Sequence, residues 1–132
     1  GVKLITDGDV AAAINTAYGE SGIDVLIGIG GAPEGVLAAV ALKCMGGELQ
    51  GKLMPRNDEE RARCLEMGLD VDRVLLMDDF VQGDNAVFAA TGVTDGELVS
   101  GVKYEEDHIF TQTLMMCAYN RTVRIINGIH RL

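Results

Sequence analysis

Basic residues are scarce in this sequence of 132 residues. Eleven lysines and arginines stand against twenty aspartates and glutamates, which gives a net charge of -9. Nucleic acids and anionic membrane surfaces are bound through basic patches, so the charge balance argues against both as the main partner. It suits a soluble protein that holds a divalent cation. An anionic substrate would then need that metal, or oriented backbone amides, to offset the repulsion.

Cysteines are also few, and long hydrophobic runs are absent. Cys44, Cys64 and Cys117 include no pair at CxxC spacing, so we expect neither a zinc site nor a disulfide framework, and a reducing cytosol fits. The apolar runs are far shorter than the ~20 residues of a membrane span. No secretory signal pattern opens the chain. We therefore expect a cytoplasmic protein without membrane contact.

The length predicts a single domain over residues 1–132, because about 150 residues per domain is usual. The composition, with 48% hydrophobic and 23% charged residues, is that of a globular chain. The sequence opens on Gly1, and a strand-like run begins at Val2. We expect such a chain to be a piece of a longer protein.

Strand-like and helix-like segments alternate through the first two thirds of the sequence. Helices are predicted from apolar periodicity and glycine stops, and strands from short apolar runs. The expected helices are residues 10–18, 33–45 and 58–67, and the expected strands are residues 2–6, 24–29, 49–53, 74–77 and 86–90. Two further β-rich runs, residues 110–119 and 122–126, flank an Asn-Arg turn and predict an antiparallel hairpin. The pattern favours an α/β layered domain with a mixed sheet of about five or more strands, helices packed on it, and this hairpin at its C-terminal end.

Polar residues cluster where predicted strands end, which is where ligands gather in such domains. Asp7 and Asp9 flank a glycine on a strand-to-helix turn. They could bind sugar hydroxyls or hold Mg²⁺ or Mn²⁺, or one of them could be a helix N-cap. Gly30 and Gly31 offer backbone amides at a helix start, a ready anion site. In the same first turn, Glu34 fits a partner of the helix dipole as well as a metal ligand.

Other motifs carry less information. Gly28 and Gly30 resemble the start of a dinucleotide fingerprint, but Pro33 stands where the third small residue should be, and Glu48 precedes its strand. A dinucleotide-binding domain is therefore a remote alternative. His108 and His130 have no partner at metal-ligand spacing, and a surface or hydrogen-bonding role is expected for each. Similarly, Thr91 to Asp95 is expected to form a turn, Asp78 and Asp79 to end a strand, and Arg61 and Arg63 to lie on a solvated helix face.

Three segments taken together resemble one enzyme family. LITDGDVAAAI (residues 4–14), IGIGGAPEGVLAAVALKCMGGELQGKL (27–53) and FAATGVTDGEL (88–98) are similar in order and content to class II fructose-1,6-bisphosphatase. This is the bacterial, metal-dependent type, which in some lineages also acts on sedoheptulose 1,7-bisphosphate. The family's enzymes are longer, so the resemblance implies that this chain is the C-terminal lobe of a two-lobe sugar-phosphatase fold.

The resemblance assigns roles to five residues. Asp7, Gly8 and Asp9 fall on the family's substrate-binding stretch, Gly31 falls on its substrate-contacting glycine, and Glu34 falls on a glutamate that helps bind a catalytic divalent metal. It implies no catalytic residue in this segment, since most of the family's acidic residues that activate water belong to the N-terminal lobe. The implied cofactor is Mn²⁺ or Mg²⁺, and a homo-oligomer is expected.

The implied reaction is hydrolysis of the 1-phosphate of fructose 1,6-bisphosphate, giving fructose 6-phosphate and phosphate in gluconeogenesis. On this reading the full-length protein is a phosphoric monoester hydrolase and the isolated segment is inactive. The alternative is a non-catalytic domain that binds sugar phosphates or regulates another protein. An upstream reading frame that encodes an acidic, metal-liganding lobe would favour the enzyme.

Overall fold

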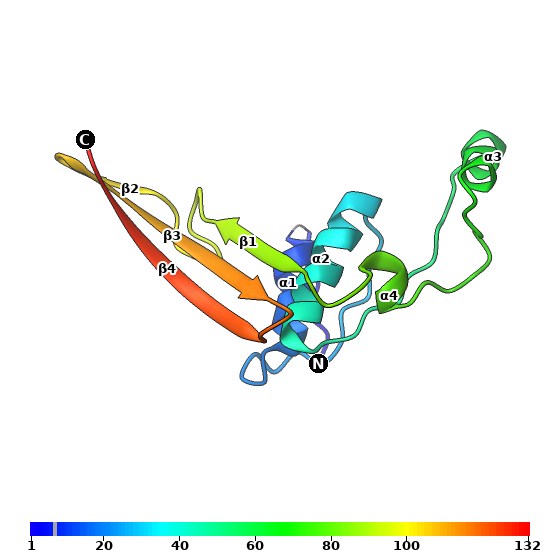
Figure 1. Cartoon of the computed structure of the whole chain (residues 1–132), viewed down its shortest axis with the longest axis horizontal. Helices are drawn as coiled ribbons and strands as arrows, with labels where there is room; N and C mark the ends of the chain where they lie inside the picture. The colour runs from blue at the N-terminus through cyan, green and yellow to red at the C-terminus, as the bar shows by residue number, and fades with distance from the viewer. Residues whose placement is uncertain (7) are drawn as a thin grey trace.

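The computed structural model describes residues 1–6 and 8–132. Its helices are α1 (Asp9–Ala17), α2 (Ala32–Met45), α3 (Asp58–Glu66) and α4 (Met77–Phe80), and its strands are β1 (Val87–Thr91), β2 (Lys103–Glu105), β3 (His108–Cys117) and β4 (Thr122–Arg131). Helices α1 and α2 lie side by side at the centre of the molecule (Figure 1). The sheet extends from them to one side, and α3 projects on the other. No helix among the described residues is long and apolar enough to cross a membrane.

The two central helices begin and end where glycine and proline predict. Gly8 precedes α1 in the left-handed region, with φ of 81°, a conformation that costs glycine nothing. Pro33 stands in the first turn of α2, where its missing N–H group removes no helical hydrogen bond. At the other end, Gly46 is left-handed with φ of 74°, and the N–H of Gly47 donates to the carbonyl oxygen of Leu42 at 2.8 Å. This glycine termination satisfies carbonyl groups of the last turn.

The sheet is built around β3. Strands β1 and β2 both pair along one edge of β3, and β4 pairs along the other edge, all antiparallel. The β3–β4 register runs without interruption from the His108–Arg131 pair to the Cys117–Thr122 pair. The predicted C-terminal hairpin is thereby confirmed, and its second strand is longer than the sequence indicated.

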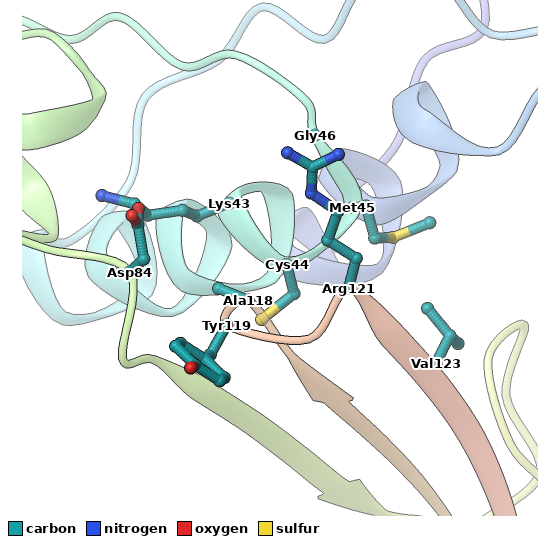
Figure 2. Close-up of a pocket in the computed structure, with 9 residues that line it drawn as sticks. All are labelled: Lys43, Cys44, Met45, Gly46, Asp84, Ala118, Tyr119, Arg121 and Val123. Atoms are coloured by element: carbon teal, nitrogen blue, oxygen red, sulfur yellow. The ribbon is translucent and has the colours of Figure 1, made fainter.

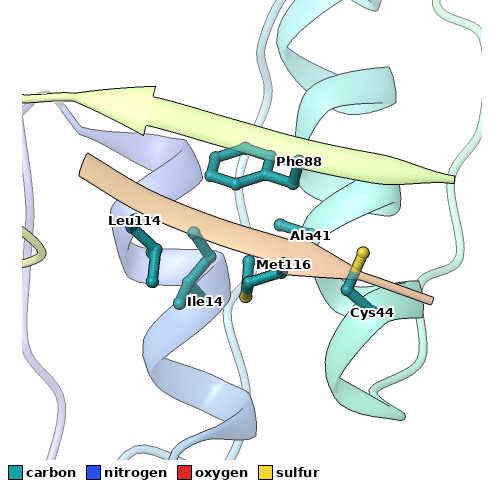
Figure 3. Packing of buried hydrophobic residues seen from close by; sticks show 6 residues of the cluster. All are labelled: Ile14, Ala41, Cys44, Phe88, Leu114 and Met116. Atoms are coloured by element: carbon teal, nitrogen blue, oxygen red, sulfur yellow. The ribbon is translucent and has the colours of Figure 1, made fainter. Parts of the chain in front are cut away.

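The core lies between the sheet and the two central helices. Leu114 and Met116 alternate along β3 and point to the same face, where Phe88 of β1 and Ile14 of α1 meet them. Ala41 and Cys44 of α2 complete this cluster (Figure 3). A second, smaller cluster of Ala13, Ala38 and Leu42 fills the space between α1 and α2. Because most of the helical side chains in these clusters are small, the two helices pack closely.

The α/β class, the three longer helices and the strand near residues 86–90 are confirmed, but the sheet itself requires a correction. The described residues form one sheet of four antiparallel strands, where the sequence predicted a mixed sheet of about five or more. Residues 2–6 and 24–29 belong to no strand of the described chain, and most of their apolar side chains are largely exposed: Val2 is 92% exposed and Ile27 is 90% exposed. Strand-forming residues fit a pleated surface, but they form a sheet only where neighbouring strands supply the hydrogen bonds.

Residues 49–53 and 74–77, also predicted as strands, contribute only one isolated bridge. Gly51 and Leu75 exchange two backbone hydrogen bonds, of 3.0 and 2.7 Å. The bridge closes the base of a projecting arm (residues 52–74), whose tip is α3 (Figure 1). No residue of α3 is buried. Ion pairs within the arm join Arg56 to Glu60, Arg63 to Glu59, and Arg61 to Asp72, so the predicted solvated face of this helix is confirmed.

Replacing Leu114 should measure how much the core contributes. Leu114 is 1% exposed, and Leu114→Ala should lower the free energy of unfolding by about 2–5 kcal/mol, because the mutation removes transfer free energy and leaves a cavity. Leu65→Ala is the matched control, since Leu65 is 61% exposed and its loss should change the free energy by less than about 0.5 kcal/mol. Urea denaturation followed by circular dichroism provides both values. Equal losses in the two variants would show that this cluster is not the core.

Candidate functional site

The starts of α1 and α2 lie beside each other, and this brings two of the predicted motifs together. Asp9 is the first residue of α1, and its carboxylate points to the glycine turn before α2. A methyl group added to Gly30 would lie 3.3 Å from Asp9 Oδ2. The hypothesis that an aspartate of this motif caps the helix is not fulfilled by Asp9, because Gly8 occupies the N-cap position.

The second motif forms the start of α2. Gly31 is the N-cap residue, Pro33 follows, and Glu34 is the acidic residue of the first turn. The Glu34 carboxylate folds back over Gly31, so closely that a Cβ on Gly31 would overlap it. An added Cβ at Gly31 would displace only the flexible end of the Glu34 side chain, and the backbone there, with φ of -70°, is open to any residue, so neither space nor backbone conformation requires glycine at this position.

The local electrostatics combine two opposite charges. The backbone N–H groups in the first turns of the two helices give positive potential, which favours an anion. Asp9 and Glu34 are both exposed, and within the described part of the chain neither side chain has a hydrogen bond or ion pair. Carboxylate oxygens so placed are available to sugar hydroxyls or to a hard divalent cation. The arrangement can thus bind a ligand that carries both hydroxyl groups and an anionic group.

A complete metal centre is not assembled by these residues. No group of three or more histidine, cysteine, aspartate or glutamate side chains that could hold a metal ion occurs among the residues that the structure describes. Glu34 offers a single carboxylate of the oxygen type that Mg²⁺ and Mn²⁺ prefer. Asp7, the other predicted substrate-binding aspartate, lies outside the described residues.

Comparison with known proteins decides the family. Residues 1–130 match the family described as bacterial fructose-1,6-bisphosphatase, glpX-encoded. The chain belongs to this family. It is 40% identical over 144 aligned positions to fructose-1,6-bisphosphatase 1 class 2 of Escherichia coli strain K12, and equally similar to the class 2 enzymes of Escherichia coli O6:H1 and Shigella flexneri. Each alignment covers 99% of this chain and 43% of the relative, so the chain spans less than half the length of these relatives.

Family membership confirms the resemblance that the motifs indicated, and it leaves the dinucleotide alternative without support.

The histidines have the surface and hydrogen-bonding roles that the sequence predicted. His130 Nε2 lies 3.0 Å from Thr111 Oγ1, and His108 Nδ1 lies 2.6 Å from Asp107 Oδ1. In the predicted turn after β1, Asp95 Oδ1 accepts a hydrogen bond from the Gly101 N–H at 2.8 Å.

Sequence reasoning missed the support behind the site, which comes from α4. The Phe80 ring contacts the backbone of α2 near its start, 3.8 Å from where a Cβ on Gly35 would be, and only 2.8 Å from where one on Gly51 would be. Residues 74–77 were predicted to be a strand, yet Met77 begins this helix. The signal that could have revealed it is Asp79, which accepts the Leu76 N–H at 2.8 Å, as a carboxylate at the third helical position often does.

A separate groove lies at the opposite end of α2. It has a volume of about 730 Å³ and is lined by the last turn of α2, by Asp84 and by the β3–β4 turn (Figure 2). Lys43 extends along one side and donates to Asp78 Oδ1 at 3.0 Å and to the Val81 carbonyl oxygen at 2.8 Å. Arg121 lies in the same lining, and cations near a helix C-terminus are favourable through the dipole. These charges therefore have a structural explanation, and the groove is not part of the candidate site.

The pH dependence of the α4 start can be predicted. The hydrogen bond from the Leu76 N–H, and then the Arg73 guanidinium, hold the pKa of Asp79 below its usual value. A lowered folded-state pKa stabilises the fold above the unfolded pKa of about 3.9, and this contribution is lost as pH falls through the folded value. Carboxyl-carbon NMR titration should show Asp79 titrating below that value. Arg73→Gln should raise the midpoint, whereas Arg121→Gln should leave it unchanged; equal effects would refute a local cause.

Proposed function

We propose that the protein carrying this chain hydrolyses the 1-phosphate of fructose 1,6-bisphosphate, yielding fructose 6-phosphate and phosphate, as a cytoplasmic enzyme of gluconeogenesis. One observation supports this most directly. The two motifs that resemble the family's ligand-binding stretches come together at the paired helix starts, where Asp9 lies against Gly30. The relatives named above are class 2 fructose-1,6-bisphosphatases.

In this proposal the chain supplies substrate contacts. Asp7 and Asp9 accept hydrogen bonds from sugar hydroxyls, and Gly8 allows the backbone between them to turn sharply and approach the sugar. Gly31 brings its backbone close to the substrate, since no side chain intervenes. Orientation by several such hydrogen bonds holds the scissile phosphate in place relative to the attacking water. Sedoheptulose 1,7-bisphosphate, which also carries hydroxyl groups and a 1-phosphate, is a second substrate under the same proposal.

The remaining component is a divalent metal, Mn²⁺ or Mg²⁺, for which Glu34 is the proposed ligand in this chain. The donor chemistry fits, because Glu34 is an exposed carboxylate without an ion-pair partner in the described residues. When bound, such a cation neutralises phosphoryl oxygens and makes water a better nucleophile. The other ligands and the groups that activate water would come from an N-terminal lobe, corresponding to the length of the relatives that this chain does not span.

Substitution of Glu34 should separate a metal ligand from a helix-dipole residue. Glu34→Gln in the full-length enzyme keeps the size of the side chain but removes its charge. Turnover should fall by about two orders of magnitude or more, and the Mn²⁺ or Mg²⁺ concentration for half-activation should rise. The melting temperature should barely change, because an exposed dipole interaction contributes only about 0.3–1 kcal/mol. Glu20→Gln is a suitable control, since Glu20 is also exposed. Unchanged metal dependence would leave Glu34 as a helix-start residue.

A non-catalytic function is the second candidate, and one observation favours it. Within the described residues no set of three metal-binding side chains comes together, so this chain by itself does not assemble a metal centre. On this alternative the paired helix starts bind a sugar phosphate without hydrolysing it.

Phosphate release by the segment and by a longer protein distinguishes the two candidates. The 132-residue chain should release no phosphate from fructose 1,6-bisphosphate with Mn²⁺ or Mg²⁺ present, whereas a longer protein with an acidic N-terminal lobe should do so. Colorimetric phosphate release gives both rates. An inactive longer protein that still binds fructose 1,6-bisphosphate by calorimetry would favour the binding domain. A fully active segment would overturn the proposed dependence on a second lobe.

A further inference from the structure

The loop after β1, residues 92–101, overlaps the third of the segments that resemble the family, yet the function proposed above gives it no part. Two hydrogen bonds close this loop. The Val102 N–H donates to the Val93 carbonyl oxygen at 3.1 Å, and Asp95 Oδ1 accepts the Gly101 N–H at 2.8 Å. The residues between these bonds are therefore held in a defined place.

The loop is also fixed to the sheet. Leu98 and Val99 pack against the core cluster, and the Ser100 N–H donates to Gln112 Oε1 of β3 at 2.8 Å. A Cβ on Gly92 would overlap the Ser100 carbonyl group, so the two sides of the loop are in direct backbone contact. The loop is thus a fixed extension of the sheet, and a side chain that it presents has a firm base.

Glu97 is the side chain that connects this loop to the motif of Asp7 and Asp9. Its Oε2 accepts a hydrogen bond from Asn15 Nδ2 at 2.8 Å, and its Oε1 lies 3.3 Å from Lys3 Nζ. In the sequence, Lys3 stands four residues before Asp7, and Asn15 stands six residues after Asp9. One carboxylate therefore contacts the chain on both sides of the motif.

The two contacts of Glu97 differ in strength. The ion pair with Lys3 is open to solvent, since the two side chains are 63% and 58% exposed, and such pairs contribute little. The hydrogen bond from Asn15 ends on a charged acceptor, which makes it stronger than a bond between neutral groups. Among the described residues, Lys3 is nonetheless the one member of residues 1–6 whose side chain has a hydrogen bond or ion pair.

We propose that Glu97 is a positioning residue for the sugar phosphate: through Asn15, and secondarily through Lys3, it holds residues 7–9 in line with the Gly30 turn. This inference rests on the proposed function, in which residues 7–9 contact the sugar. Glu97 itself is not a ligand-binding residue. Its partner Asn15 lies about 9 Å along α1 from the first helical residue, at a rise of about 1.5 Å per residue.

A hydrogen bond adds something that the core contacts of α1 do not. Ala13 and Ile14 hold the helix through apolar contacts, which have no preferred direction. The bond from Asn15 to Glu97 is directional, so it limits rotation of α1 about its axis. Rotation would turn the Asp9 carboxylate away from the sugar. Because sugar hydroxyls remote from the reacting phosphate are bound alike before and during the reaction, the loss should appear in KM and not in kcat.

Steady-state kinetics of the full-length enzyme with Mn²⁺ test this role. Glu97→Ala and Asn15→Ala should each raise KM for fructose 1,6-bisphosphate about fivefold, the effect of one weakened hydrogen bond, with kcat within about twofold of the parent. The double variant should be no worse than either single variant, because both remove the same bond. Glu97→Gln keeps an acceptor oxygen and should restore most of the affinity. Glu66→Ala, which removes an exposed carboxylate of α3, is the control and should leave KM unchanged.

The same measurements separate this inference from the proposed function. The metal concentration for half-activation should not change in any of these variants, since the metal ligand is intact. A lower melting temperature with unchanged KM would show a purely structural role and overturn the proposal, as would additive effects of the two alanine substitutions. Phosphate release by the parent tests the proposed function on its own. If the parent binds fructose 1,6-bisphosphate without hydrolysing it, dissociation constants from calorimetry replace KM in the same comparison; a parent that does neither would overturn both.

Discussion

The packing of α1 and α2 against each other and against one face of the sheet determines the remaining structure. Ala13, Ala38 and Leu42 fill the space between the helices, and small side chains let two helix axes approach closely. Leu114 and Met116 hold both helices to β3. Because the helices are fixed in this way, their first turns lie beside each other, and residues far apart in the sequence meet at the candidate site. The geometry of the candidate site therefore depends on apolar contacts in the core.

Features governed by short-range chemistry could be predicted from the sequence. Gly8, Pro33 and Gly46 mark helix boundaries because their backbone requirements are local. The Asn-Arg turn between two β-rich runs likewise predicts its hairpin. The predicted strands at residues 2–6 and 24–29 are absent from the described residues, and local sequence could not reveal this. An apolar run can specify an extended chain, but its hydrogen-bond partners must come from elsewhere, and within the described chain they do not.

In the candidate site, too, some features follow from local sequence and others depend on tertiary packing. The sequence identified Asp9, Gly31 and Glu34 separately, each with an ordinary structural explanation beside the functional one. Their proximity depends on tertiary packing, and the contact of Asp9 with the Gly30 turn is not visible in any local pattern. The Phe80 ring behind Gly35 and Gly51 was missed for the same reason. No further metal ligand beside the candidate Glu34 could be identified, because no group of three or more metal-binding side chains occurs among the described residues.

The projecting arm has a consequence for local stability. The ion pairs of α3 lie within the arm, and in the described part of the chain the arm is joined to the body only at its base, by the Gly51–Leu75 bridge and the Arg73–Asp79 ion pair. Exposed ion pairs are screened by salt, and segments with little buried apolar surface open at low free energy. Amide protons of α3 should therefore exchange with solvent long before those of α2 or β3. Both ends of the arm leave the body at the same bridge. A protease that cuts within the arm would therefore break the chain, but the two fragments would stay side by side at that bridge.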